Sequence, residues 1–255
     1  MAVCLVGAPC AKGKLLALDI EEARKLPGVV AVLTSNDIPG HKLWGPIMED
    51  EPLLVVEQIE FLEQPVCIIA AESKSVAKKA AKLVKIEVES YAPVLSIQEA
   101  DDLGQYLGDE QQISRGDVEA QLSSAEHVVE GSFSVAGQEQ FYLESQAALA
   151  EPRERDEITV YSSTQNPTEI QKVVAEALGL RHHQVICTTQ RMGGAFGGKE
   201  TQGTQPAVLV ALIAQLTGRP ARIVYNKALD MRITGKRHET HFTYRIAVDL
   251  SLIHI

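Results

Sequence analysis

Short apolar runs and one amphipathic stretch dominate the first hundred residues. Residues 26–34 (LPGVVAVLT) and 65–72 (PVCIIAAE) are runs of β-branched and apolar side chains that predict strands, the second of them buried. Residues 73–84 place apolar side chains at helical spacing with lysines on the other face, and residues 84–91 alternate as a half-exposed strand does. Because a strand, a helix and a strand follow one another, this region is expected to be a small α/β unit that contains a crossover.

A polar stretch then separates this unit from a second apolar region. Residues 101–116 are rich in Gly, Asp and Gln and predict a linker. Residues 117–125 favour a short helix, residues 126–135 alternate as a strand does, and residues 158–164 form another strand-like run. The chain therefore resumes regular structure after the linker.

The signals for a helix are densest from residue 166 onward. Asn166 can cap a helix that has Pro167 at its first position and Glu169 in its first turn, and Gly179 can end it. The apolar side chains between these points fall on one helical face. Three further strands are expected at 184–190, 221–225 and 242–249, and an almost wholly apolar helix, which should be buried, at 206–217.

Composition and charge narrow the functional classes. The 255 residues are 45% hydrophobic, enough for a real core, and acids outnumber bases for a net charge of −10. Such a chain repels phosphate backbones unless it segregates a basic face, and no run of Lys or Arg indicates one, so nucleic acid is not expected as a partner. No apolar stretch reaches the ~20 residues that span a bilayer, and Cys4, Cys10, Cys67 and Cys187 have no metal-ligand spacing. We expect a cytoplasmic protein with reduced cysteines.

One glycine-rich segment is the strongest candidate for chemistry. Residues 191–200 (RMGGAFGGKE) hold four glycines within six positions, which favours a binding loop over a flexible turn. Gly193, Gly198 and Lys199 fit most of the phosphate-loop pattern, but Glu200 stands where a hydroxyl should hold Mg²⁺. A carboxylate there would repel nucleotide phosphates, so a nucleotide hydrolase is excluded.

Four ordered stretches carry a resemblance to known proteins. They are Gly137–Glu144 (GQEQFYLE), Ser162–Thr168 (SSTQNPT), Gln190–Thr201 (QRMGGAFGGKET) and Ile233–His238 (ITGKRH). Together they are similar to the molybdenum site of the xanthine dehydrogenase/aldehyde oxidase family, with Ala195 in place of a third glycine. The resemblance implies an α+β chain: a small α/β hammerhead domain at 1–103, then the first, incomplete part of a molybdenum cofactor-binding domain at 117–255.

The resemblance also implies how a cofactor is held. In this family a pterin holds the molybdenum and no protein side chain binds the metal directly, so the protein acts through groups around it. Gln165 matches the glutamine that hydrogen-bonds an oxygen ligand of the metal. Phe196 and Gly197 match the loop backbone that approaches the metal's apical oxygen, and Gly194 belongs to the same cradle. The plainer alternatives are that Gln165 only leads into the helix at 167 and that Phe196 is a hydrophobic plug.

Glu200 decides the expected substrate. It matches the glutamate that hydrogen-bonds the purine in xanthine dehydrogenases, where aldehyde oxidases carry an apolar residue. A buried carboxylate that pairs with ring N–H groups selects a polar heterocycle, because leaving it unpaired is costly. The alternative is an ion pair between Glu200 and Lys199.

The implied reaction hydroxylates hypoxanthine or xanthine to urate with molybdopterin. Electrons leave through 2Fe-2S clusters and FAD to NAD, all on other segments or subunits of an oligomer. The family's general-base glutamate and a substrate-binding arginine lie beyond Ile255, so no catalytic residue is expected here. We expect an N-terminal fragment that is inactive alone, with Ser251–Ile255 departing from the family as an artefact.

Two rival functions remain open at this stage. One is an aldehyde oxidase-type molybdenum hydroxylase, and the other is a non-catalytic fragment that docks an iron–sulfur/FAD partner. The histidine pairs His182–His183 and His238–His241 invite a metal site, but no further ligands lie near them in the sequence, so we assign them none.

Overall fold

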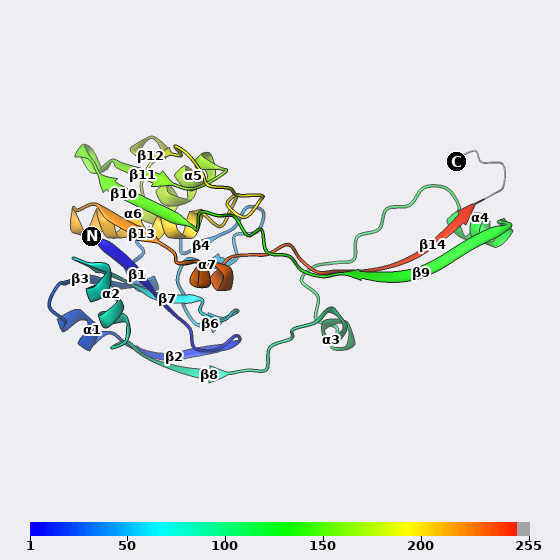
Figure 1. Cartoon of the computed structure of the whole chain (residues 1–255), viewed down its shortest axis with the longest axis horizontal. Coiled ribbons are helices and arrows are strands. Elements are labelled where there is room, and N and C mark those ends of the chain that lie inside the picture. Colours follow the sequence, from blue (N-terminus) through cyan, green and yellow to red (C-terminus); the bar gives the residue numbers. More distant parts are fainter. Residues whose placement is uncertain (249–255) are drawn as a thin grey trace. The chain divides into compact units, whose positions relative to one another are not determined.

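A computed structural model of the chain describes residues 1–248; the expected artefact at 251–255 lies outside the described residues. The chain divides into two compact units (Figure 1). The core unit comprises residues 1–93 and 140–235, and the ribbon unit comprises residues 94–139 and the chain from residue 236 onward.

A seven-stranded sheet organises the core unit. Its order is β12 (Val185–Thr188), β11 (Ile158–Ser162), β10 (Ala147–Pro152), β13 (Ala221–Val224), β1 (Ala2–Gly7), β7 (Pro65–Ala71) and β3 (Val29–Thr34). Strand β1 joins the two halves of this sheet. It runs parallel to β13, with Ala2 opposite Arg222. Strands from the first hundred residues and from residues 140–235 therefore share one sheet.

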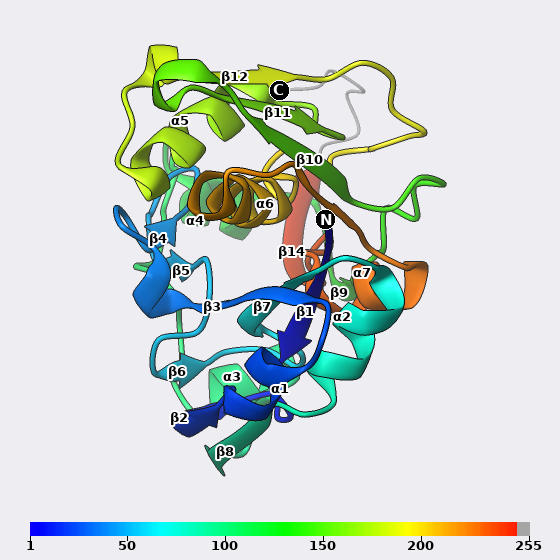
Figure 2. The same cartoon turned by 90° about the vertical axis from the view of Figure 1, so that its left-hand side faces the viewer.

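Two helices fill the space on one face of the sheet. They are α5 (Pro167–Leu178) and α6 (Thr204–Thr217), and Figure 2 shows the sheet curving around α6. Every residue of α6 from Thr204 to Ala214 is buried, as the almost wholly apolar sequence predicts. The expected start and end of α5 are confirmed, because Asn166 caps it and Gly179 ends it at φ +67°.

The β7 strand is buried on both faces, as its unbroken apolar sequence predicts. Ile68 and Ala70 belong to the core that includes α6, whereas Cys67, Ile69 and Ala71 belong to a second core. The second core also holds α1 (Glu21–Lys25) and α2 (Lys74–Ala81) through their buried alanines. Helices thus cover both faces of the sheet at β7.

The expected crossover through α2 is wrong. The strand after α2 is β8 (Lys85–Ser90), which does not join β7 but pairs antiparallel with β2 (Gly13–Asp19) in a three-stranded sheet with β6 (Gln58–Ile59). The burial of β8 alternates between half-buried and exposed residues, which suits a sheet with one face in water. The order of elements along the chain did not determine which strand β8 would join.

Smaller elements complete the core unit. They are η1 (Ser35–Asp37), β4 (Leu43–Trp44), β5 (Glu51–Pro52), η2 (Glu154–Asp156), η3 (His182–Gln184) and α7 (Lys227–Ile233). Over residues 1–248, no helix combines the length and apolar character that crossing a membrane requires.

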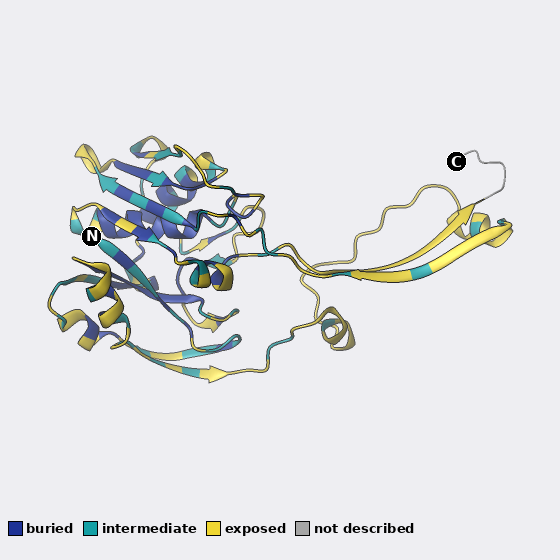
Figure 3. Ribbon diagram, viewed as in Figure 1, coloured by how far each residue is buried: buried dark blue, intermediate teal, exposed yellow. Residues whose placement is uncertain are grey.

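The ribbon unit consists of two short helices and a two-stranded antiparallel ribbon. The helices are α3 (Ile97–Asp102) and α4 (Val118–Ser124), and the strands are β9 (His127–Val135) and β14 (Thr240–Val248), with Phe133 opposite Phe242. The expected linker at 101–116 is exposed along its whole length and has no helix or strand after Asp102. Figure 3 shows that the ribbon strands are exposed almost throughout.

Candidate functional site

The glycine-rich segment forms a loop between β12 and α6 in the core unit. Gly194 and Gly197 have φ values of +95° and +90°, which side chains rarely tolerate. Phe196 also has a positive φ, +54°, and its side chain is 75% exposed. A bulky residue in that conformation is strained, and such strain concentrates at functional sites. Ala195 is not among the residues with positive φ, so its methyl group is compatible with the loop.

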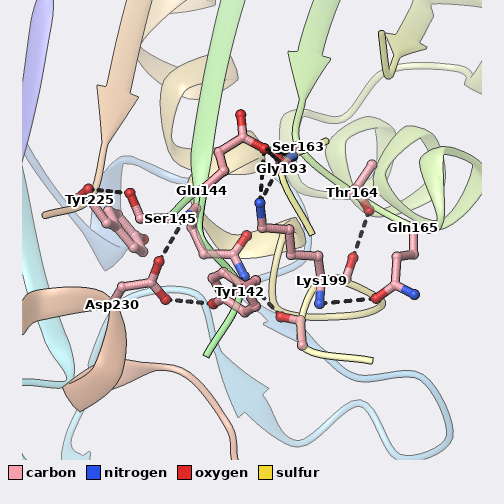
Figure 4. Close-up of polar contacts among 12 residues, drawn as sticks. Tyr142, Glu144, Ser145, Ser163, Thr164, Gln165, Gly193, Lys199, Tyr225 and Asp230 are labelled. Carbon is pink, nitrogen blue, oxygen red and sulfur yellow. Dashed lines mark hydrogen bonds and ion pairs between the residues drawn. The ribbon is translucent and has the colours of Figure 1, made fainter. Parts of the chain in front are cut away.

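Gln165 lies against this loop, in the turn between β11 and α5. Its side-chain Oε1 accepts hydrogen bonds from the backbone N–H of Gly197 at 3.1 Å and of Lys199 at 3.3 Å. The backbone N–H of Gln165 donates to the Lys199 carbonyl at 2.9 Å. The structure therefore brings together Gln165 and Gly197, which the sequence placed in one site. Because the Gln165 carbonyl oxygen is used, its amide nitrogen is directed away from the loop (Figure 4).

The same loop carries backbone donors without internal partners. Within residues 1–248, the N–H groups of Gly194, Ala195 and Phe196 donate to no acceptor. Successive N–H groups in a glycine-rich turn form a site for anionic oxygen atoms. These donors and the Gln165 amide fit an anionic, oxygen-rich cofactor such as molybdopterin. Over the same residues, no cluster of three His, Cys, Asp or Glu side chains could hold a metal directly.

Glu200 follows the loop and is exposed. Its N–H donates to the Gly197 carbonyl at 3.5 Å, which keeps its backbone next to the glycine-rich loop. Burial raises the pKa of the neighbouring Glu169 carboxyl, and the charge of Glu200 raises it further. The Glu169 and Glu200 carboxylates therefore lie close enough to interact electrostatically.

A buried charged cluster on the other side of the loop was not identified from the sequence. The ammonium of Lys199 lies 3.1 Å from Glu144 Oε2 and 2.7 Å from Ser163 Oγ, and the Lys199 side chain is fully buried (Figure 4). The alternative ion pair between Lys199 and Glu200 is wrong, because Lys199 pairs with Glu144. Glu144 closes the Gly137–Glu144 stretch, so that stretch was the available signal for its role.

The ionisation of this cluster follows from its partners. Burial would raise the pKa of the Glu144 carboxyl, but hydrogen bonds from Gly193, Ser163 and Lys199 outweigh it and lower the pKa. Burial lowers the pKa of Lys199 more than the nearby carboxylates raise it. The short contacts therefore favour the charged form of Glu144, whereas burial disfavours the charged form of Lys199.

A second polar network contacts the glycine-rich loop. The Tyr142 hydroxyl donates to Asp230 at 2.6 Å, and Asp230 also accepts from the Gln146 N–H at 2.7 Å. The Gln146 side-chain amide donates to the Gly198 carbonyl at 2.9 Å. Tyr142, Gln146 and Asp230 are all buried, and burial raises the pKa of the Tyr142 hydroxyl.

A hollow near the site does not contain the expected site residues. It measures about 490 Å³ and is lined by Glu144, Ser163, Gln190 and Arg191 together with the open side of β10, β11 and β13. Gln165, Phe196 and Glu200 do not line it and lie on the exposed surface of the core unit. Glu200 is therefore exposed and is not enclosed by this hollow.

Comparison with known proteins places the chain in a family. Residues 2–92 match the aldehyde oxidase and xanthine dehydrogenase a/b hammerhead domain, and residues 101–251 match the molybdopterin cofactor-binding domain. The chain belongs to the aldehyde oxidase and xanthine dehydrogenase family of molybdenum-containing oxidoreductases. Its fold is accordingly a hammerhead domain followed by a molybdopterin-binding domain.

Particular relatives agree with this assignment. The chain is 41% identical to the xanthine dehydrogenase of Drosophila pseudoobscura pseudoobscura over 92% of its length, and 37% identical to aldehyde oxidase 2 of Cavia porcellus over 96%. Among solved structures, the aldehyde oxidoreductase of Desulfovibrio gigas matches with a TM-score of 0.84 and 25% identity, over 96% of this chain and 29% of that chain. The chain spans 18% of the length of each of these two curated relatives.

Proposed function

We propose that this chain supplies the cofactor-holding loop and a substrate contact of a molybdenum hydroxylase that converts hypoxanthine or xanthine to urate. The single observation that carries this is the contact of Gln165 with the glycine loop, which presents N–H groups that are unpaired within the described part of the chain and whose Gly197 carbonyl accepts from the Glu200 N–H. The similarity to xanthine dehydrogenases over 92% of the chain supports the same reaction. In each hydroxylation, water supplies the oxygen, the purine carbon loses two electrons, and NAD accepts them with one proton through 2Fe-2S and FAD groups carried elsewhere while a second proton is released. Xanthine needs one such step to reach urate, and hypoxanthine needs two.

The residues of this chain would hold molybdopterin by hydrogen bonds. When bound, the cofactor supplies the oxygen-transfer and electron-transfer chemistry that side chains lack. Gln165 would donate its amide N–H to an oxygen around the metal, because its carbonyl oxygen is fixed by Gly197 and Lys199. The N–H groups of Gly194, Ala195 and Phe196, which donate to no acceptor within residues 1–248, would face the same anionic group, and the Phe196 ring would cover it.

Glu200 would bind the substrate. A carboxylate accepts hydrogen bonds from purine ring N–H groups, and a site built for such bonds rejects analogues without them. The exposure of Glu200 in this chain leaves it free to make that contact. We propose that further polypeptide encloses this position in the complete enzyme.

The remaining parts of the proposal concern the context of the chain. The hammerhead domain at 1–103 and the cofactor-binding domain at 117–255 are supported by the family matches to residues 2–92 and 101–251. A reducing cytoplasmic location agrees with four free cysteines. Because the chain spans 18% of its relatives, we propose that it needs an iron–sulfur/FAD partner or segment, works in an oligomer, and does not turn over alone.

The test uses the complete enzyme that contains this chain. Glu200→Val should lower kcat/KM for xanthine at least tenfold and leave the molybdenum content unchanged, because it removes a substrate contact and no cofactor contact. Glu157→Val, an exposed position elsewhere in the core unit, serves as the matched control. Undiminished purine turnover in Glu200→Val would contradict the substrate assignment.

Oxidation of aldehydes is the second candidate. It is favoured by the 37% identity to aldehyde oxidase 2 of Cavia porcellus and by the match to the aldehyde oxidoreductase of Desulfovibrio gigas. The same variant discriminates the two, because an aldehyde lacks the N–H groups that Glu200 would bind. If Glu200→Val left turnover of aldehydes and of xanthine unchanged, and the wild type preferred aldehydes, the second candidate would hold. A non-catalytic docking role predicts binding of an iron–sulfur/FAD partner without any molybdenum in the chain.

A further inference from the structure

Both ends of the glycine loop meet at one carboxylate. Glu144 Oε2 accepts a hydrogen bond from the Gly193 N–H at 2.9 Å, where the loop begins, and lies 3.1 Å from the Lys199 ammonium, where the loop ends. The backbone of Glu144 also donates to the Gly193 carbonyl at 3.1 Å. A Cβ at Gly193 would lie 2.7 Å from the Glu144 Cβ, so only glycine allows this approach. One side chain thus closes residues 193–199 into a ring.

The Lys199 ammonium is buried, and buried charged groups are rare in proteins. Its side chain is fully buried, and its partners are Glu144, the Ser163 hydroxyl at 2.7 Å and the face of the Tyr142 ring at 4.8 Å. Ser163 also donates to Glu144 at 2.9 Å, so the three side chains form a closed triangle. A buried ion pair is weak as a source of stability, and an apolar residue could fill the same volume. A role in specifying one loop conformation accounts for the charge better.

Lys199 also connects this triangle to the proposed cofactor contact. Its side chain points to Glu144 while its backbone N–H donates to Gln165 Oε1 at 3.3 Å (Figure 4). Gln165 holds the Gly197 N–H with the same oxygen. Movement of Lys199 would therefore disturb both the loop and the side-chain amide nitrogen of Gln165, which is directed away from the loop.

We propose that Glu144 and Lys199 are positioning residues that lock the loop at 193–199 in its donor-presenting conformation before any ligand binds. The inference rests on the proposed function only for the identity of the ligand, molybdopterin. Preorganised donors avoid the ordering cost that a flexible loop would incur on binding. Neither residue needs to touch the cofactor for this role.

The pH dependence of the lock follows from the charged groups that face it. Glu144 faces Lys199, and Lys199 faces Glu144, Asp230 and Lys227. The pKa of Glu144 is lowered in the folded chain, so its contribution is present above the usual carboxyl range and is lost as the pH falls through the lowered value. The loop should therefore open in acid before the core unit unfolds.

The test is hydrogen exchange of the 255-residue chain without cofactor. Protection factors are measured for the Gly193, Gly197 and Lys199 amides, with the buried α6 amides as an internal reference. Glu144→Gln and Lys199→Met should each lower loop protection at least tenfold at pH 7 and leave α6 unchanged. Lys172→Met, which removes an exposed ion pair with Glu49, is the matched control and should change neither. Unchanged loop protection in both lock variants would overturn the proposal.

The wild-type chain provides a readout that does not depend on either variant folding. Its loop protection should fall at least tenfold as the pH is lowered from 6 to well below the ordinary carboxyl range while α6 stays protected, and Glu144→Gln, if folded, should show no such fall. A loop that stays protected across this range in the wild type would also overturn the proposal, since a purely packed loop has no reason to respond to acid.

Molybdopterin retention separates this inference from the proposed function. If the lock variants loosen the loop and also lose pterin, both hold. If they loosen the loop but bind added molybdopterin as well as the wild type does, the lock holds and the assignment of the loop to the cofactor fails. If loop protection is unchanged, the lock fails whatever the pterin content.

Discussion

Tyr142 and Asp230, 88 positions apart in the chain, are joined by a hydrogen bond of 2.6 Å between two buried side chains. Both carboxylate oxygens of Asp230 accept hydrogen bonds, because the second oxygen accepts from the Gln146 N–H. The bond ties α7 to the segment that leads into β10. The same network contacts the glycine-rich loop, because the Gln146 side-chain amide donates to the Gly198 carbonyl.

Removing Asp230 should unfold the core unit more readily. Asp230→Ala leaves the Tyr142 hydroxyl and the Gln146 N–H buried without their acceptor, and we expect a loss of about 2–4 kcal/mol in the free energy of unfolding. Tyr142→Phe removes one partner and should cost about 1 kcal/mol. Urea denaturation measures both, with the exposed Asp109→Ala as the control. A loss equal to that of the control would contradict this account of the network.

The Glu144–Lys199 pair should show strong coupling in stability. Glu144→Gln leaves a buried ammonium without its counter-charge and should cost about 3 kcal/mol, whereas Lys199→Met leaves a carboxylate that is 39% exposed and should cost less. The double variant should be more stable than the sum of the two losses predicts, by about 1 kcal/mol or more. Denaturant midpoints of the four proteins complete this cycle. Simple additivity would show that the pair is not energetically linked.

The strained backbone at Phe196 predicts a substitution that does not destabilise the chain. Asn tolerates positive φ better than Phe, and the Phe196 side chain is 75% exposed and buries little area. Phe196→Asn should leave the free energy of unfolding unchanged or raise it by up to ~1 kcal/mol. Phe133→Asn in the ribbon unit, where Phe133 stacks on Phe242 at 4.8 Å between ring centroids, should lower it. Thermal unfolding compares the two, and a clear loss in Phe196→Asn would show that the ring packs more than its exposure indicates.

Thiol labelling should distinguish the cysteines. Burial raises the pKa of the Cys67 thiol to about 12, so the thiol stays protonated until the pH rises towards that value. At pH 8 about one molecule in ten thousand carries its thiolate, which is the reactive form. Iodoacetamide followed by peptide mass spectrometry should modify the half-buried Cys10 long before Cys67. Equal rates at both would mean that β7 opens readily.

Local signals predicted the helices and most strands but not their partners. Asn166, Pro167 and Gly179 act within one helix, so the bounds of α5 followed from the sequence. The partner of β8 depends on which distant strand offers a matching face, and the helix before it carries no such information. Long-range pairing is decided by packing rather than by propensity.

The sequence likewise predicted some features of the candidate site and missed others. Gln165 and Gly197 were expected in one site because both lie in stretches that resemble one family, although 32 positions separate them; the hydrogen bond between them was not predicted. The pair of Glu144 with Lys199 spans 55 positions. Both residues lie in stretches that resemble the family, but the resemblance assigned neither of them a role, so the pair was not predicted. Phe196 departs from its own propensity, since no sequence rule would give a phenylalanine a positive φ.

The parallel pairing of β1 with β13 has a consequence for how the chain reaches its native state. Residues from the start of the chain and from beyond residue 200 contribute to one hydrophobic core, so the N-terminal segment cannot bury its side of that core until the ribosome has delivered α6 and β13. Contacts of such separation slow folding and leave apolar surface open in the meantime. The hammerhead segment, expressed as residues 1–93, would expose the β1 edge and the apolar faces of Val3 and Ile68, and is expected to aggregate where the longer chain does not.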